Sequence, residues 1–223
     1  MVAASSPLVR IAPRVLVTGF EPFDGEAVNP SWMSAQALHG RVIAGHRVIG
    51  ACLPTAFAAS LAVLRELLLR HRPALVLCTG QAGGRAALSL ERVAINVDDA
   101  RIADNAGAQP VDLPVVSGGP AAYFSTLPIK AMQAALQRAG IAAEVSQTAG
   151  TFVCNHVFYG LMHELAVHRE LRSTRGGFIH LPWVPAQGQP CVPLEQMVRG
   201  LRLAIGCALV ATQDIRKEAG ALH

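Results

Sequence analysis

The sequence predicts an α/β fold in which a mixed, partly parallel sheet is packed between two layers of helices, an α/β/α sandwich. Short β-branched segments alternate along the chain with longer segments of helical periodicity, a pattern typical of strand–helix–strand units. With 223 residues, the chain is long enough for one domain with a sizeable core. We find no repeat, low-complexity segment or linker. We therefore expect a single domain over residues 1–223, with residues 1–12 as a flexible lead-in.

The N-terminal half contains three predicted strands and two predicted helices. β-Branched residues at 14–18 indicate a buried strand that stops at Gly19. Asn29 followed by Pro30 is typical of a helix start, with asparagine as the cap and proline in the first turn. The remaining elements of this half are a strand at 46–53, a helix at 55–71 and a buried strand at 73–79.

The C-terminal half continues the alternation. Residues 88–97 alternate as a strand would, and residues 98–114, rich in Asp, Asn, Gly and Pro, are expected to form a functional loop. Val157, Leu161 and Leu165 recur every fourth position and predict a helix that starts near Asn155. The other expected elements are a helix at 128–139, a strand-like segment at 142–148, a turn at 173–177, a strand at 177–182 and a helix at 193–213.

Composition narrows the classes of function. Hydrophobic residues make up 52% of the chain, and no apolar run approaches the ~20 residues of a membrane span. The net charge of +4 comes from scattered arginines without a basic run, so we expect no nucleic-acid and no membrane partner. The N-terminal stretch does not have the pattern of a secretory signal. Five cysteines without a C-x-x-C pair argue against disulfides or a zinc site and favour a reducing cytoplasm.

Cys154 is placed at a predicted strand-to-helix junction, where a small-residue turn precedes the helix. The unpaired N–H groups and the positive dipole end of a helix start favour thiolate over thiol, and they can also receive an oxyanion. The alternative is a buried cysteine that fills a small apolar gap. The residues alone leave both interpretations open.

His180 is the favoured partner of this thiol among the eight histidines, because it ends a buried strand, where α/β folds gather catalytic groups. His156 is only two residues after Cys154, an offset that does not bring two side chains face to face on a helix, and His163 and His168 belong to later turns of the same helix. Glu91 either pairs with a neighbouring arginine on a wet face or, if partly buried, orients the imidazole.

Two loops after predicted strands are candidates for ligand contacts. Phe20 and Phe23 either cap the core or form the walls of an apolar pocket. The glycine-rich turn at 80–85 lacks Gly-Lys-Ser/Thr and G-x-G-x-x-G, so it is a weak nucleotide signal, and we expect no cofactor or metal. Its glycines more naturally allow a ligand to approach the backbone, with Gln81 offering amide hydrogen bonds.

Eight ordered motifs between residues 15 and 213 give a specific resemblance to a known family. They are T-G-F-E-P-F from Thr18, N-P-S-W from Asn29, G-Q-A-G-G-R from Gly80, E-R-V-A-I-N from Glu91, A-R-I-A-D-N from Ala100, G-G-P-A-A-Y from Gly118, T-A-G-T-F-V-C-N-H from Thr148 and G-G-F-I-H from Gly176. The sequence resembles the pyroglutamyl peptidase type I family, cysteine peptidases that remove an N-terminal pyroglutamyl residue from peptides.

The resemblance implies a phosphorylase/hydrolase-like fold and a role for each matching residue. Cys154 corresponds to the nucleophile, His180 to the base and Glu91 to the acidic member of a triad. The residues that match the substrate pocket are Phe20, Phe23, Gln81, Phe152, Val153 and Arg101, where Arg101 is an active-site arginine of unassigned role. Glu21, Asp24 and Ala103 depart from common family residues, which affects loop rigidity and fine specificity. The family also implies a homodimer or homotetramer.

Two other functions are compatible with the same fold. One is a phosphate-dependent, nucleoside phosphorylase-like enzyme that uses the 80–85 turn for phosphate. The other is a catalytically silent ligand-binding protein.

Overall fold

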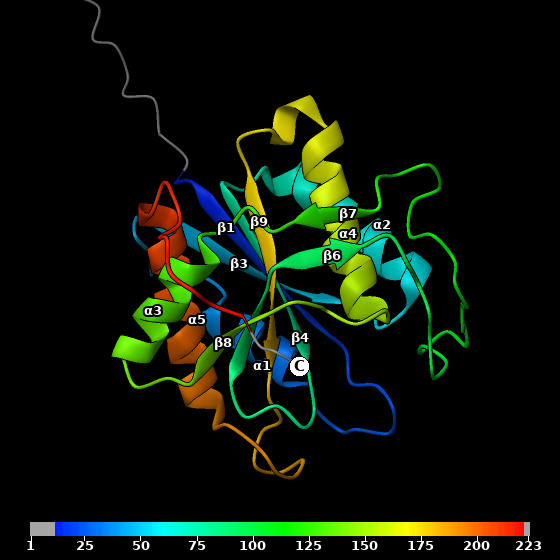
Figure 1. Cartoon of the computed structure of the whole chain (residues 1–223), viewed down its shortest axis with the longest axis horizontal. Coiled ribbons are helices and arrows are strands. Elements are labelled where there is room, and N and C mark those ends of the chain that lie inside the picture. The colour runs from blue at the N-terminus through cyan, green and yellow to red at the C-terminus, as the bar shows by residue number, and fades with distance from the viewer. Residues whose placement is uncertain (1–11, 221–223) are drawn as a thin grey trace, which may run out of the picture.

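The computed structural model describes residues 12–220. Except for Ala12, the lead-in expected at residues 1–12 lies outside the described residues. The described chain forms one large sheet and one small sheet (Figure 1). The strands of the large sheet are β1 (Arg14–Phe20), β2 (Val42–Ile43), β3 (His46–Leu53), β4 (Leu75–Gln81), β5 (Leu88–Glu91), β8 (Ala143–Ser146) and β9 (Arg175–Leu181). The small sheet pairs β6 (Val93–Ile95) with β7 (Ala122–Phe124).

The large sheet is mixed, as predicted, and its strand order is β2-β3-β1-β4-β9-β5-β8. Strands β3, β1, β4 and β9 run parallel to one another. Strand β5 is antiparallel to β9 and parallel to β8. The four central parallel strands therefore end at the same edge of the sheet, where α/β folds usually place their sites.

Helices cover both faces of the sheet (Figure 1). The helices are α1 (Pro30–Leu38), α2 (Phe57–His71), α3 (Ile129–Arg138), α4 (Val153–Val167) and α5 (Leu194–Val210), with a 3₁₀ turn, η1, at Arg169–Leu171. Helices α1, α3 and α5 bury one core against one face of the sheet, and α2 and α4 bury a second core against the other. This arrangement confirms the predicted α/β/α layers.

Local sequence explains where the main elements begin. Helix α1 starts at Pro30 because the side chain of Asn29 accepts a hydrogen bond from the backbone N–H of Ser31, at 3.0 Å. Strands β4 and β9 are buried along almost their whole length. Such unbroken apolar runs are typical of inner parallel strands with helices on both faces.

The predicted strand at 88–97 is wrong in its continuity. It breaks at Arg92 into β5, which belongs to the large sheet, and β6, which pairs with β7. The backbone of Arg92 joins both layers, because its N–H donates to Ser146 O and its carbonyl accepts from Ser125 N. Alternation of apolar residues continues through the break, so the pattern alone gives no sign of it.

The predicted turn at 173–177 is also wrong at its C-terminal end, because β9 already begins at Arg175. Gly176 and Gly177 serve close packing here. An added Cβ would lie 2.8 Å from a methyl carbon of Leu165 at Gly176, and 2.4 Å from the hydroxyl of Ser125 at Gly177. Two adjacent glycines therefore indicate a crowded strand at this position.

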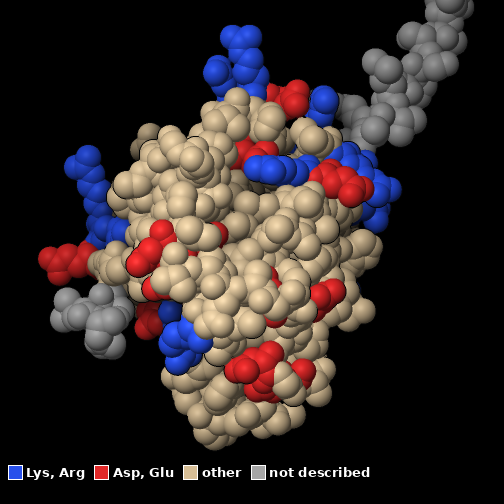
Figure 2. Space-filling view, turned by 90° about the vertical axis from the view of Figure 1, so that its right-hand side faces the viewer, with Lys and Arg blue, Asp and Glu red and all other residues tan. Residues whose placement is uncertain are grey.

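The surface carries few charges. Figure 2 shows charged side chains of both signs separated by broad uncharged areas on the face with α2 and α4. Within residues 12–220, no helix is both long and apolar enough to cross a membrane.

Candidate active site

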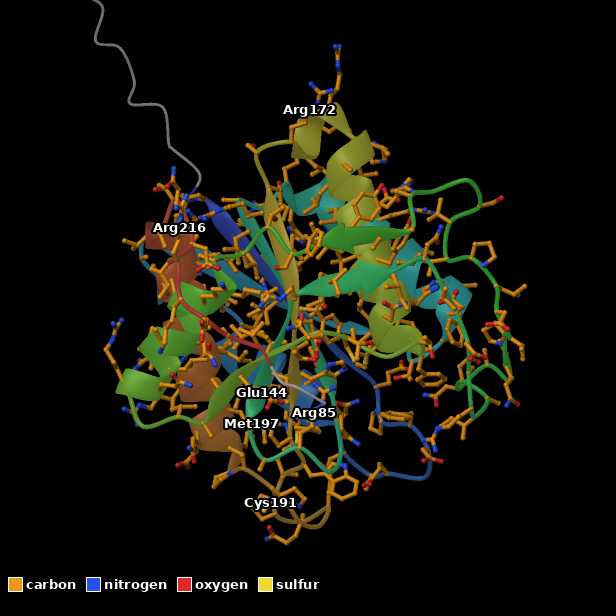
Figure 3. The ribbon with its side chains drawn as sticks, viewed as in Figure 1. Arg85, Glu144, Arg172, Cys191, Met197 and Arg216 are labelled. Atoms are coloured by element: carbon orange, nitrogen blue, oxygen red, sulfur yellow. The ribbon has the colours of Figure 1, made fainter. Side chains whose placement is uncertain are left out.

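Three elements of the large sheet converge where the site forms. Gly80 of β4 is the register neighbour of His180 on β9, and Ser89 of β5 is the neighbour of His180 on its other side. Figure 3 shows Arg85 toward the lower end of the molecule and Arg172, just before β9, at the upper end. Because β9 runs from Arg175 to Leu181, Arg85 and His180 both lie toward its carboxyl end.

Cys154 lies in the first turn of α4, which begins at Val153, slightly before the predicted start. The turn between β8 and α4 passes through Gly150, whose φ of 77° is in the left-handed region that favours glycine. Phe152 precedes the helix and provides no side-chain cap. The first backbone N–H groups of α4 are consequently not capped by the Phe152 side chain and can serve a bound anion.

The thiol of Cys154 lies directly over Gly80. A Cβ added to Gly80 would lie 2.6 Å from Cys154 Sγ and 2.9 Å from Phe178 Cζ, both too close for real carbon contacts. Adjacent strands are about 4.8 Å apart, so the residue beneath the sulfur is one strand from His180. The absence of a side chain at Gly80 leaves room for the sulfur on the strand next to the one that carries His180.

His180 and Glu91 form a buried hydrogen-bonded pair, with 2.8 Å between His180 Nδ1 and Glu91 Oε1. The exposed fractions are 4% for His180 and 0% for Glu91. Since Ser89 faces His180 in the register, Glu91 is its diagonal neighbour on the same face of the sheet. The ring of Phe178 packs against the imidazole with 4.8 Å between centroids.

Arg85 also binds Glu91, with 2.9 Å between Arg85 Nη1 and Glu91 Oε1. The sequence left open whether Glu91 pairs with an arginine or orients a histidine, and the structure shows both contacts on one oxygen. The predicted alternative of a wet face is wrong, because the Glu91 side chain is completely buried. Two partners hold the carboxylate in place.

Burial raises the pKa of the Cys154 thiol to about 12. The carboxylate of Glu91 contributes to this rise in pKa, whereas the guanidinium of Arg85 acts against it. The effect of burial on this pKa is therefore opposite to the effect expected from the helix start, which favours the thiolate. A thiol held in this protonated form needs a base beside it to become nucleophilic.

A cavity of about 670 Å³ opens beside the start of α4. Four of the predicted pocket residues line it: Phe23, Gln81, Arg101 and Phe152. The other two, Phe20 and Val153, are 2% and 1% exposed and belong to the core beneath the site. Their predicted contact with substrate stays a prediction.

The cavity walls are held by aromatic and amide contacts. The ring of Phe152 packs against Phe57 edge-to-face at 5.4 Å between centroids, and against Phe23 at 6.1 Å. The amide oxygen of Gln81 accepts a hydrogen bond from Gln187 Nε2 at 2.9 Å. This contact orients the Gln81 side chain and leaves its NH₂ group to donate elsewhere.

Sequence reasoning missed Trp183 and Gln187. Trp183 lines the cavity and covers Gly83, where an added Cβ would lie 2.4 Å from the indole ring. Both residues follow β9, the strand that carries His180, so their place shortly after that strand was the available signal. Within residues 12–220, no group of three or more His, Cys, Asp or Glu residues is arranged to hold a metal ion.

Comparisons with known proteins show the family of the chain. The sequence model described as "Pyroglutamyl peptidase" matches residues 13–211. The pyrrolidone-carboxylate peptidase of Cupriavidus taiwanensis is 57% identical over 216 residues, which cover 95% of this chain and 100% of that protein.

Two solved structures share the fold. The pyroglutamyl peptidase I of Bacillus amyloliquefaciens is 46% identical with a TM-score of 0.90, over 93% of this chain and 100% of that one. The pyrrolidone carboxyl peptidase of Thermococcus litoralis is 32% identical with a TM-score of 0.89, over 92% and 99%. With sequence and fold in agreement, the chain belongs to the pyroglutamyl peptidase family of cysteine peptidases.

Proposed function

We propose that Cys154, His180 and Glu91 carry out the reaction of this family in this chain, hydrolysis of the amide bond that follows an N-terminal pyroglutamyl residue of peptides and proteins. The observation that supports this most is the close approach of Cys154 Sγ to Gly80, next to a His180 imidazole that Glu91 already orients. A nucleophile, a base and a group that orients the base are the parts of a covalent hydrolase.

In the first half-reaction, His180 Nε2 takes the proton of the Cys154 thiol, because Nδ1 is committed to Glu91. The sulfur attacks the carbonyl carbon of the pyroglutamyl group, and the first N–H groups of α4 stabilise the oxyanion. When the tetrahedral intermediate collapses, the C–N bond breaks and His180 gives its proton to the leaving amine. The shortened peptide departs, and a pyroglutamyl thioester remains on Cys154.

In the second half-reaction, His180 takes a proton from water as the water oxygen attacks the thioester. The C–S bond then breaks, pyroglutamate leaves, and the sulfur regains its proton from His180. Glu91 stabilises the imidazolium in both halves without itself taking the proton.

The cavity suits a neutral, flat lactam. A pyroglutamyl group has no free amine, so its pocket needs apolar walls and a few hydrogen-bonding groups. Phe23 and Phe152 supply such walls in the described cavity, and the oriented amide of Gln81 supplies a donor. Phe20 and Val153 support the cavity from the core beneath it, and Arg101 lies at the exposed rim of the cavity.

Neither alternative function is supported. The 80–85 turn, which a phosphorylase would use for phosphate, has Gly83 under the Trp183 ring and Arg85 bound to Glu91. A catalytically silent ligand-binding protein has no need of a buried, hydrogen-bonded His180–Glu91 pair.

The test is release of a fluorogenic amine from pyroglutamyl-amide, measured beside the prolyl- and alanyl-amides. We expect cleavage of the pyroglutamyl compound alone, no dependence on phosphate, and loss of activity after thiol alkylation. Cleavage of all three amides would contradict the pocket assignment. Activity that requires phosphate and survives alkylation would favour the phosphorylase.

We further propose that the chain forms a homodimer or homotetramer and works in the cytoplasm. Exposed apolar side chains such as Phe124 (68% exposed) and Val111 (65%) support association, which light scattering of purified protein tests. All five cysteines are free thiols, which supports a reducing compartment. Peptides with an N-terminal pyroglutamate are the proposed partners.

A further inference from the structure

A second buried histidine–carboxylate pair lies near the site and has no part in the reaction above. The distance between His156 Nδ1 and Asp98 Oδ2 is 2.7 Å, and the two residues are 7% and 6% exposed. His156 is in the first turn of α4, two residues after Cys154. At that spacing its side chain points to a different side of the helix from the thiol.

The pair links the start of α4 to the base of the loop at 98–113, where the two ends of the loop meet. Asp98 exchanges two backbone hydrogen bonds with Leu113, at 2.7 and 3.0 Å, and these close the loop at its base. The next residue, Asp99, is bound twice by Thr151, through the Asp99 N–H and through the threonine hydroxyl. Asp99 and Arg101 on the loop side, and Thr151 on the helix side, all line the cavity.

The imidazole of His156 is also connected to the cavity wall, because the ring of Phe57 packs between it and Phe152. Phe57 packs edge-to-face against His156, at 5.3 Å between centroids, and against Phe152, at 5.4 Å. The backbone N–H of Phe57 donates to the carboxylate of Asp104, which lies on the same loop, at 2.8 Å. The loop is thus fastened to α4 through Asp98 and to α2 through Asp104.

We propose that Asp98 and His156 are positioning residues that hold the loop at 98–113 and Phe152 together as the two walls of the substrate cavity. This inference rests on the proposed function, because it concerns binding of the pyroglutamyl group. When the pair is broken, only a fraction of the molecules have the two walls in place at any time. The apparent substrate affinity then falls by that fraction.

Substrate affinity and turnover should respond differently to loss of the pair. Glu91 and His180 lie on β5 and β9, and Sγ rests on Gly80 of β4, so the reacting groups keep their own supports. We therefore expect KM for pyroglutamyl-amide to rise about tenfold or more, with kcat per titrated active site within about threefold of the wild type.

Four variants separate positioning from folding. His156→Leu removes the donor and leaves Asp98 without its partner, which destabilises the fold as well. Asp98→Leu combined with His156→Leu replaces both polar groups, a change that is often nearly neutral for stability. His156→Asn keeps a donor near the Nδ1 position and should restore KM. His163→Leu is the matched control, because His163 is on the same helix and binds Tyr123 instead.

Steady-state kinetics are measured on each variant that folds, as judged by thermal unfolding, with active sites counted by stoichiometric alkylation of Cys154. The proposal predicts a raised KM in the double variant despite recovered stability, rescue by His156→Asn and a normal KM in His163→Leu. A KM within twofold of the wild type in the folded double variant overturns it, even if His156→Leu fails to fold. A wild-type protein that does not cleave pyroglutamyl-amide would instead overturn the proposed function.

Discussion

A single methyl group at Gly80 should disable the site. In Gly80→Ala, the added carbon would lie 2.6 Å from Cys154 Sγ and 2.9 Å from Phe178 Cζ. The Phe178 ring has little freedom to yield, because it is 1% exposed and packs against Phe158 at 5.9 Å between centroids. The sulfur, which is on a partly exposed residue, is the atom that moves.

The size of the effect follows from the distance. Ordinary non-bonded contacts are about 3.5–4.0 Å, so the sulfur has to move by about 1 Å. A displacement of about 1 Å at a reacting group costs about 100-fold in rate. We therefore expect kcat/KM for pyroglutamyl-amide to fall about 100-fold, which is about 2.7 kcal/mol in the activation free energy.

The assay compares Gly80→Ala with Gly206→Ala, both checked for folding by thermal unfolding. Gly206 is in α5, and an added Cβ there meets only Ile43 Cγ2, at 3.7 Å, an ordinary contact. That control should keep wild-type activity. If folded Gly80→Ala retains kcat/KM within threefold of the wild type, the sulfur does not work from its place over Gly80, and the reasoning is refuted.

Three further predictions concern the acidic residue, a buried thiol and the support of α4. Glu91→Gln should lower kcat by about 10²–10⁴-fold, since the imidazole loses the group that orients it and stabilises its charge, and an unchanged kcat would contradict the triad. Removal of the negative charge should also lower the pKa of Cys154, so alkylation of that thiol at neutral pH should become faster. Burial raises the pKa of Cys78 from its usual 9.0 to about 12, so the folded protein holds the thiol proton more tightly than the unfolded protein does. The contribution of the protonated Cys78 to the free energy of unfolding is complete below pH 9 and is lost as the pH rises toward 12, at up to about 1.4 kcal/mol per pH unit. Chemical denaturation from pH 8 to 11 should therefore show a shallower decline for Cys78→Ala than for the wild type, and parallel curves would refute this. Asn155 binds Ile95 N, Ile95 O and Val97 O, so Asn155→Ala should lower the free energy of unfolding by about 3 kcal/mol, and a loss below 1 kcal/mol would show that these bonds contribute little.

Strong periodicity made much of the fold predictable. The predicted strand at 46–53 coincides with β3, and the helix predicted near Asn155 is α4, which begins at Val153. His180 was singled out because a buried strand ends there, and the structure places it beside Glu91. Such inferences depend on local pattern and on the edge at which parallel strands end, and both can be read from sequence.

Contacts between distant segments were not predictable in the same way. The break at Arg92 depends on hydrogen bonds to Ser125 and Ser146, residues from other segments. His156 and Asp98 lie 58 positions apart, and their pairing depends on the path of the intervening loop. The sequence predicted that the first strand stops at Gly19 and that Phe20 is in a loop, but Phe20 is the last residue of β1, and its burial depends on the helix residues that pack over this strand.

The most direct test of the central claim is the hydrolysis rate of pyroglutamyl-amide by Cys154→Ala. Cys191→Ala is the matched control, since Cys191 is another partly exposed free thiol and lies between β9 and α5, outside the elements that carry Cys154, His180 and Glu91. With the nucleophile gone, we predict a fall in kcat of about 10⁴-fold or more, and a wild-type rate in the control. If folded Cys154→Ala keeps more than about 1% of wild-type kcat, a rate well above that of other hydrolases without their nucleophile, Cys154 does not form the covalent intermediate.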